Sequence, residues 1–270
     1  MRWFVAVLLW DSRIGIGFTR PEAARAFGCS DGTIYYWEKG ERHPRPSEVA
    51  QIALTYRLTE KVRRYLKMIL ERKDSQRIEA DPRLHALVLS KAELHSGFIF
   101  KYEPNLIPGP LQTRDYHFGY TQKAEGTSDT DANEGWTFKH GRQVGIGNRK
   151  DEPTIQYLIG NSAILGLRDL PLEAAIGQVN RMLADQDRSG VEIRVIAKFH
   201  RGRNAPFEIF KPGGSRTAPP VFVYSESLHG SWCIEEDALV AMYDGAGQAM
   251  WQLGIPLKEF LDEHCRDLLA

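Results

Sequence analysis

The stretch RPEAARAFGCSDGTIYYW, residues 20–37, decides how this sequence folds. Small and apolar residues recur in it at the spacing of a helix-turn-helix, with Ala24 in fifth and Gly28 in ninth place. A bulky residue in place of Ala24 would push two crossing helices apart, and Gly28 adopts the positive φ that a tight turn requires. Ile34 and Trp37 supply the apolar face of the second helix. The stretch therefore predicts two short helices that cross closely at an alanine.

Capping residues mark where both helices begin. Thr19 precedes the first helix, which has Pro21 and Glu22 in its first turn, and Ser30 precedes the second helix. Threonine and serine at such positions accept a hydrogen bond from a backbone amide of the first turn, and the helix dipole favours an early glutamate. An ordinary helical hairpin would show the same pattern, so the neighbouring sequence has to distinguish a structural hairpin from a DNA-binding one.

The residues that follow favour the DNA-binding interpretation. Residues 39–46, KGERHPRP, combine a glycine that ends a helix with a basic turn stiffened by proline, and another helix is expected from about Ser47. The arrangement resembles the Xre family of regulators, relatives of the phage lambda repressor. The residues that carry this resemblance are Thr19, Ala24, Gly28, Ser30, Glu38, Gly40 and Pro44. The resemblance implies a small helical domain that binds double-stranded DNA.

Length and charge predict two domains. A chain of 270 residues is too long for one such module, which needs about 60 to 70 residues. The formal net charge is zero, yet residues 1–73 carry 14 Lys and Arg against 8 Asp and Glu, whereas the remainder carries 21 against 27. Screening beyond about 10 Å keeps the attraction of the basic part for DNA local. We predict a DNA-binding domain at residues 1–74, called the head, and a C-terminal regulatory or partner-binding domain at residues 75–270, called the body.

The composition is typical of a globular protein of the cytoplasm. Hydrophobic residues make up 42% of the chain and charged residues 26%. Cys29, Cys233 and Cys265 lack the paired spacing of a zinc site or a disulfide framework, so reduced thiols are expected. The apolar residues 1–10 lack a small-x-small cleavage site and run directly into Asp11. No segment approaches the ~20 apolar residues of a membrane span, so we expect no membrane association.

Apolar periodicity predicts the remaining helices of the head. The first helix is expected over Trp3–Arg13, and its apolar residues run around most of its circumference. One small domain cannot bury so much apolar surface, so Trp3, Val7 and Trp10 are expected to cover a partner surface or the body. The fourth and fifth helices are predicted at Pro46–Tyr56 and from Thr59 to about Arg72.

Helical and extended patterns alternate in the body and predict a mixed sheet flanked by helices. Helices are expected at Pro82–Ser96, Asn133–Val144, Asn161–Leu167, Pro171–Asp187, Glu235–Gln252 and Pro256–Leu268. Strands are expected at Phe98–Tyr102, Thr154–Ile159, Val191–Ile196, Pro206–Phe210, Pro219–Tyr224 and Ser231–Ile234. The predicted fold class is mainly α plus α+β, with a five-helix lambda-repressor-like head followed by a mixed α/β body.

Residues 102–116, YEPNLIPGPLQTRDY, form the second informative stretch. They predict a strand end, a Pro-Gly-Pro turn and a helix capped by Thr113. The stretch is similar to the Tyr-Glu-Pro, Ile-Pro-Gly, Leu-Gln-Thr and Asp-Tyr segment of WhiJ-like, antitoxin-type regulators of actinobacteria, whose C-terminal domain has an uncertain role. The departures are Pro110, His117 and the glycines of residues 141–147. The resemblance covers nearly the whole chain and implies a small acidic protein as partner.

A DNA-binding head would place the second helix of the helix-turn-helix in the major groove, with its N-terminal residues facing the bases. The expected readers are Asp31, Gly32, Thr33 and Tyr36, with Arg20 beside a phosphate or a base, and the expected phosphate contacts are Lys39, Arg42, His43 and Arg45. The alternatives are a helix-start charge for Asp31 and a solvated basic loop for the phosphate contacts. One recognition helix reads few base pairs, so a homodimer on a near-palindromic site is expected.

Catalytic patterns are poor in this sequence. His200, His229 and His264 lie on separate predicted elements, without the spacing of a metal site. Ser162 and Ser225 lie outside any Gly-x-Ser-x-Gly elbow. We therefore expect no enzymatic activity, no metal and no cofactor.

The leading hypothesis is a sequence-specific transcriptional regulator whose body responds to a protein partner, and two alternatives remain open. In the first, the body senses a small molecule in an aromatic pocket, although a plain sheet core explains the same aromatic residues. Those residues are Phe98, Phe100, Tyr102, Tyr157 and Phe222. In the second, the chain has lost DNA binding and acts as an interaction protein, as the acidic Asp31 and the uncharged Tyr35 and Tyr36 suggest.

Overall fold

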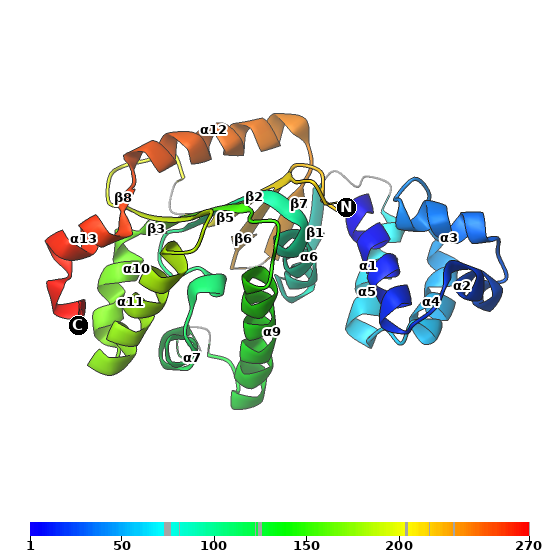
Figure 1. Ribbon diagram of the computed structural model, residues 1–270, viewed down its shortest axis with the longest axis horizontal. Helices are drawn as coiled ribbons and strands as arrows, with labels where there is room; N and C mark the ends of the chain where they lie inside the picture. The colour runs from blue at the N-terminus through cyan, green and yellow to red at the C-terminus, as the bar shows by residue number, and fades with distance from the viewer. Residues whose placement is uncertain are drawn as a thin grey trace.

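The computed structural model has two lobes that lie side by side, helices α1 to α5 of the head and the remaining elements of the body (Figure 1). It describes residues 1–72, 77–80, 82–121, 123, 126–202, 205–215, 217–228 and 230–269. The boundary predicted at residues 74–75 lies outside the described residues and stays a prediction.

All five predicted helices of the head are present. They are α1 (Arg2–Gly15), α2 (Arg20–Phe27), α3 (Asp31–Glu38), α4 (Val49–Thr55) and α5 (Glu60–Glu71). A 3-10 turn at Pro46–Glu48 leads into α4. The Thr59 side chain caps α5 by accepting a hydrogen bond from the Val62 amide. Buried Ile34, Ile52 and Leu66 bring α3, α4 and α5 into one core, which is the five-helix arrangement that the sequence predicts.

The body is built on a mixed sheet of eight described strands, in the order β1-β7-β6-β5-β2-β3-β4-β8. The strands are β1 (Arg77–Ala80), β2 (Ser96–Glu103), β3 (Thr154–Gly160), β4 (Val191–Ile196), β5 (Phe207–Pro212), β6 (Phe222–Ser227), β7 (Gly230–Ile234) and β8 (Ile255–Pro256). Strands β2, β3 and β4 run parallel, and the other neighbouring pairs are antiparallel. The body is therefore an α/β domain, as predicted.

Helices cover the two faces of the sheet unequally (Figure 1). One face packs against α6 (Pro82–His95), α9 (Asp129–Gly147), α10 (Asn161–Leu165) and α11 (Leu172–Gln186), with the short α7 (Arg114–Tyr116) beside them. The other face carries α12 (Asp237–Leu253), and α13 (Leu257–His264) follows near the C-terminal end. The core beneath α12 is small and centres on Phe100, Tyr102 and Trp251, whereas the core on the opposite face continues into the head.

The differences between the predicted and observed elements have local causes. The sequence does not predict β8, which is only two residues long and contains Pro256, or β1, in which Ile78 is buried. Strand β6 begins at Phe222, because Pro219 and Pro220 lack the amide hydrogen that a strand ladder uses. The predicted polar helix continues through the glycines to residue 147 as α9.

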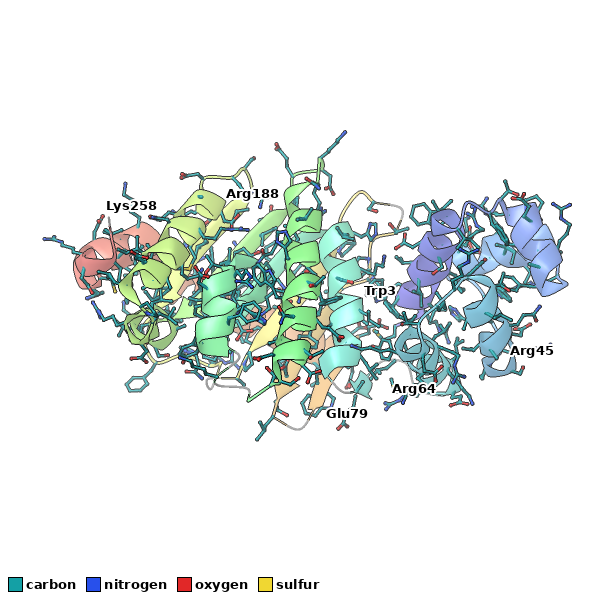
Figure 2. All side chains as sticks on the ribbon, turned by 90° about the horizontal axis from the view of Figure 1, so that it is seen from below. Trp3, Arg45, Arg64, Glu79, Arg188 and Lys258 are labelled. Carbon is teal, nitrogen blue, oxygen red and sulfur yellow. The ribbon has the colours of Figure 1, made fainter. Side chains whose placement is uncertain are left out.

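Helix α1 is shared by the head and the body. Its Phe4 ring lies 5.6 Å from the Tyr65 ring of α5, inside the head. Its Trp3 ring lies 5.5 Å from the Phe222 ring of β6, inside the body. Figure 2 shows Trp3 at the junction of the two lobes. The apolar surface that encircles α1, predicted to cover a partner surface or the body, therefore packs against the body.

Trp3→Ala should weaken the junction and destabilise both lobes. Trp3 is 9% exposed, and removing a buried tryptophan side chain costs about 3 to 5 kcal/mol of unfolding free energy. Urea unfolding followed by two probes, one in each lobe, should change from a single transition to two. Leu54→Ala is the control, because Leu54 of α4 is 82% exposed and its loss should cost under about 0.5 kcal/mol. Equal effects of the two substitutions would contradict the shared role of α1.

Buried charges tie α6 and α9 to the sheet. The Lys101 ammonium of β2 lies 2.8 Å from the Glu93 carboxylate of α6 and also pairs with Glu208 of β5. The Arg142 guanidinium of α9 donates to the same Glu93 carboxylate at 2.8 Å. Burial opposes the ionisation of Glu93, but the charges of Arg142 and Lys101 outweigh it and lower its pKa. A charged group left unpaired here would be costly, so the cluster fixes the position of both helices.

Glu103→Gln should reduce the pH dependence of stability. Burial, followed by repulsion from Glu208 and Glu226, raises the pKa of Glu103 to about 8. The protonated carboxyl is thus favoured on folding, and its contribution is complete below the ordinary glutamate pKa and lost as the pH rises through 8. Urea unfolding of the wild type between about pH 5 and about pH 9, which spans most of that range, should show declining stability that Glu103→Gln diminishes. Glu259→Gln, an exposed carboxylate of α13, is the control, and parallel curves for all three proteins would refute the expectation.

Candidate nucleic-acid interface

The helix-turn-helix forms as the sequence predicts, with both caps in place. The Thr19 hydroxyl accepts from the Glu22 amide at 3.4 Å, and the Thr19 amide donates to the Glu22 carboxylate at 2.7 Å. Gly28 ends α2 with φ 65°, the left-handed conformation that favours glycine. The Ser30 hydroxyl accepts from the Thr33 amide at 3.1 Å and caps α3. These contacts fix the start of α3 relative to α2.

The close crossing of α2 and α3 is fully packed. Ala24 is 4% exposed, Ile34 is 1% exposed and Trp37 is 6% exposed, and all three belong to one hydrophobic cluster. The Phe27 ring lies 6.1 Å from the Trp37 ring and extends the contact to the end of α2. The buried face of α3 therefore holds its opposite face outward.

A buried carboxylate ties α3 to both preceding helices. Glu38, at the end of α3, has a side chain only 2% exposed. It accepts hydrogen bonds from two guanidinium groups, those of Arg13 in α1 (Nη2 at 3.1 Å) and of Arg20 in α2 (Nε at 2.9 Å). The Arg13 Nη1 also donates to the Phe18 carbonyl at 2.7 Å, and hydrogen bonding to Glu38 is the main cause of the raised pKa of Arg13. Sequence reasoning missed this triad because its members lie on three separate elements.

Arg20 thus has a structural contact in addition to the DNA contact predicted for it. Its guanidinium carbon lies 5.1 Å from the centre of the Tyr35 ring, and its side chain keeps 36% of its surface exposed. Glu38 and Tyr35 hold the Arg20 side chain beside α3. The DNA contact itself stays a prediction.

The residues of α3 that are predicted to read bases differ in their exposure to solvent. Asp31 and Gly32 are exposed, and Tyr36 is 37% exposed. Thr33 is half-buried, with its hydroxyl 3.0 Å from the Ser30 hydroxyl. Asp31 and Gly32 are therefore the most accessible of these residues, and the cap orients the Thr33 hydroxyl.

The two tyrosines of α3 organise the basic residues around them. The Lys39 ammonium lies 4.7 Å from the centre of the Tyr35 ring, and the Arg42 guanidinium carbon lies 5.0 Å from the centre of the Tyr36 ring. The faces of aromatic rings attract cations at such distances. Hydrogen bonding to Tyr35 is also the main cause of the raised pKa of Lys39. The uncharged tyrosines therefore hold cations beside the exposed face of α3.

The two remaining predicted phosphate contacts differ in their placement. Arg45 is exposed, and Figure 2 shows its position on the head, away from the body. His43 is half-buried, and both of its ring nitrogens are buried and have no hydrogen-bond partner among the described residues. Burial, with a smaller contribution from Arg2, lowers the pKa of His43. The phosphate contact predicted for His43 therefore disagrees with its placement, because a neutral, enclosed imidazole offers no charge to a phosphate.

The residues considered for chemistry are dispersed. His264 is an exposed residue at the end of α13, and His200 follows β4 near Tyr102. The Ser162 hydroxyl donates to the Pro104 carbonyl, and the Ser225 hydroxyl donates to the Pro206 carbonyl at 3.5 Å. His229 lies outside the described residues. Within the described part of the chain, no group of three His, Cys, Asp or Glu side chains has the arrangement of a metal site.

The aromatic residues proposed for a sensing pocket do not share one cavity. Phe98 and Phe100 line a cavity of about 610 Å³ beside α12, together with Trp251. Tyr157 and Phe222 belong to the core on the opposite face of the sheet. The single aromatic pocket envisaged from the sequence is therefore wrong, because side chains on alternate positions of neighbouring strands point to both faces.

The chain combines a helix-turn-helix domain with an α/β domain, which defines a DNA-binding type of regulator. Residues 8–66 match the family model described as a helix-turn-helix domain. Residues 86–259 match the model described as a domain of unknown function (DUF5753), and the chain belongs to this family. Among the described residues, no helix has both the length and the apolar character needed to cross a bilayer.

Further comparisons add little. No match is found among curated proteins. One similar solved structure is that of TrmBL2, described as an archaeal chromatin protein with a novel mode of DNA binding. The two sequences are 13% identical, and the match covers 94% of this chain and 92% of the TrmBL2 chain, with a TM-score of 0.36. A TM-score this low supports no conclusion about the present chain.

Glu38→Gln should destabilise the head. The substitution leaves the buried Arg13 guanidinium without its carboxylate, which costs about 3 kcal/mol of unfolding free energy. Urea denaturation followed by tryptophan fluorescence measures the loss. Glu41→Gln is the matched control, because Glu41 is 54% exposed and lies 3.6 Å from Lys39, so its loss should cost under about 0.5 kcal/mol. A Glu38→Gln protein as stable as this control would show that the triad contributes nothing to the placement of α3.

Proposed function

We propose that the protein is a sequence-specific transcriptional regulator that inserts α3 into the major groove of double-stranded DNA. The proposal is carried by one observation: α3 is held by packing on one face and leaves Asp31, Gly32 and Tyr36 exposed on the other. Lys39 and Arg42 lie beside that exposed face on the two tyrosine rings. Cations that flank an exposed helix of this kind suit phosphate contacts on either side of a groove.

A homodimer is part of the proposal. One α3 helix of eight residues reaches only a few base pairs. Regulators of this type gain specificity by presenting two such helices to half-sites about one DNA turn apart. We therefore propose a near-palindromic operator and two copies of the chain.

The proposed function excludes catalysis. Within the described part of the chain, the candidate histidines and serines lie on separate elements, and this dispersal supports a binding protein. We propose that the chain has no enzymatic activity and needs no cofactor.

Control by a small acidic protein, as in antitoxin-like modules, is a further part of the proposal. Residues 1–73 carry an excess of six positive charges, and the remainder carries an excess of six negative charges. Long-range attraction would draw an acidic partner toward the head, where it would compete with DNA. Loss of DNA binding on titration with such a partner, restored by excess operator, would support this mode of control.

Arg42→Gln should weaken binding to any duplex and reduce its salt dependence. Each phosphate contact that is lost lowers the slope of log affinity against log salt by about 1. Fluorescence anisotropy with random duplex DNA from low to physiological salt measures the slope. Lys258→Gln is the control, because Lys258 is an exposed residue of α13 that Figure 2 shows far from the head. Absence of binding at low salt would favour the alternative in which the chain is only an interaction protein.

Thr33→Ala should act on specificity instead. The Thr33 hydroxyl contacts Ser30 and faces the N-terminal end of α3, so its removal should weaken operator binding while affinity for random duplex stays unchanged. Footprinting on the DNA upstream of the gene identifies the operator, and thermal melting confirms that the variant is folded. Equal losses on operator and random DNA would contradict the reading role of Thr33.

A further inference from the structure

A cavity lies where the three parallel strands of the body end. Its volume is about 540 Å³, and its lining includes residues that follow β2, β3 and β4, among them Asn105, Ser162 and Lys198. In open α/β sheets, ligands bind beyond the carboxyl ends of the parallel strands. The size also falls within the range of small-molecule sites, roughly 300 to 1,000 Å³.

The stretch 102–116 divides between this cavity and the core. Its first part supplies Tyr102 and Pro104 to the cavity wall. Its second part is a buried scaffold, in which the Ile107 amide donates to the Tyr116 hydroxyl at 3.0 Å. The Gln112 side-chain amide donates to the Ile107 carbonyl at 2.6 Å. The scaffold therefore holds the first part of the stretch at the wall.

The wall is closely built where β2 and β3 end. A Cβ on Gly160 would lie 2.0 Å from the Pro104 carbonyl oxygen, so only glycine permits this approach. The Ser162 hydroxyl donates to the same carbonyl at 2.8 Å and lies 3.3 Å from the Asn105 amide oxygen. The polar groups of the wall are thus held in fixed positions in advance of any ligand.

A hydrogen-bond chain holds the fully buried Tyr102 side chain against His200, which lines the cavity. The Gly202 amide donates to His200 Nδ1 at 3.1 Å, so this nitrogen carries no proton. Burial lowers the pKa of His200, and the neutral ring then carries its proton on Nε2. That nitrogen lies 3.1 Å from the Tyr102 hydroxyl and donates to it. The His200 ring is therefore held in a fixed position at the cavity wall.

The charge and shape of the lining select the ligand. Lys198 is exposed and has no ion-pair partner in the described part of the chain, and no described lining residue is Asp or Glu. A cation without a competing carboxylate suits an anion. Phe199 stands fully exposed at the cavity, with 105% of its reference surface accessible. An isolated, exposed aromatic ring beside a polar cavity suits a planar, apolar group.

We propose that this cavity binds a small organic anion, a carboxylate or phosphate monoester with a planar apolar group, through Lys198 and Phe199. The site is separate from α3 and does not depend on the DNA-binding proposal. Its occupancy is measured directly on the full chain without DNA, so its failure and the failure of the proposed function are distinguishable.

The experiment uses isothermal titration of the full chain with phenyl phosphate and with benzoate. Inorganic phosphate and phenol are the comparison probes, each lacking one of the two parts. At least one of the two organic anions should bind saturably, about tenfold more tightly than either comparison probe, because each part of the ligand contributes roughly 1.4 kcal/mol or more. Equal affinity for inorganic phosphate would overturn the organic part of the proposal. Absence of saturable binding by both organic anions would overturn the site.

Matched variants locate the binding. Lys198→Met should lower the affinity about tenfold, since it removes the charge and keeps the length of the side chain. Phe199→Ala removes the exposed ring and should lower the affinity for the organic anions about tenfold. Lys258→Met, on α13, is the control and should bind as the wild type does. Thermal melting checks that each variant is folded. Unchanged affinity in both cavity variants would overturn the assignment even if the probes bind.

Discussion

The structure depends on helix α1 packing into two cores at once. A helix in one small domain needs a single apolar stripe, yet α1 is buried from Trp3 to Leu9. Phe4 fills the head and Trp3 reaches β6 of the body, so a single hydrophobic cluster continues from one lobe into the other. An ion pair between Asp11 and Lys91 of α6 adds a polar contact. The lobes are therefore joined by a packed interface, and the direction in which α3 faces follows from the position of the body.

This junction limits how the body can influence DNA binding. The Tyr65 ring of α5 lies 5.8 Å from the His85 ring of α6, and His85 Nδ1 lies 2.7 Å from the Ser231 hydroxyl of β7. A change in the body would reach the head through such packed and hydrogen-bonded contacts, because side chains at close-packed interfaces change position in discrete steps. The same contacts would set the distance between two heads in a dimer.

The sequence predicts well what neighbouring residues decide and poorly what the tertiary structure decides. Thr19, Gly28 and Ser30 are recognisable because caps and turns depend on residues within a few positions. The Glu38 triad joins residues 18 and 25 positions apart, and no local pattern reports such a contact. The enclosed position of His43 likewise results from packing, so its apparent place in a basic turn is misleading. The cavity beside Tyr102 could not be predicted from the sequence, because its position depends on β2, β3 and β4 being parallel neighbours.

The arrangement of charge around α3 would separate two tasks of a DNA-binding helix. One is affinity for the phosphates, and the other is discrimination between base sequences. The exposed residues of α3 include Asp31, Gly32 and Tyr36, whereas the cations Arg20, Lys39 and Arg42 come from outside α3. Arg20 and Lys39 lie against the same Tyr35 ring, and cations placed in this way suit phosphate contacts, which contribute affinity that is independent of sequence. The rings of Tyr35 and Tyr36 hold these cations in place without adding positive charge to the groove itself. Discrimination between base sequences would then rest on the exposed residues of α3. A small shift of the helix would change each of their contacts, so the rigidity provided by Glu38 and α1 would be a condition for specificity.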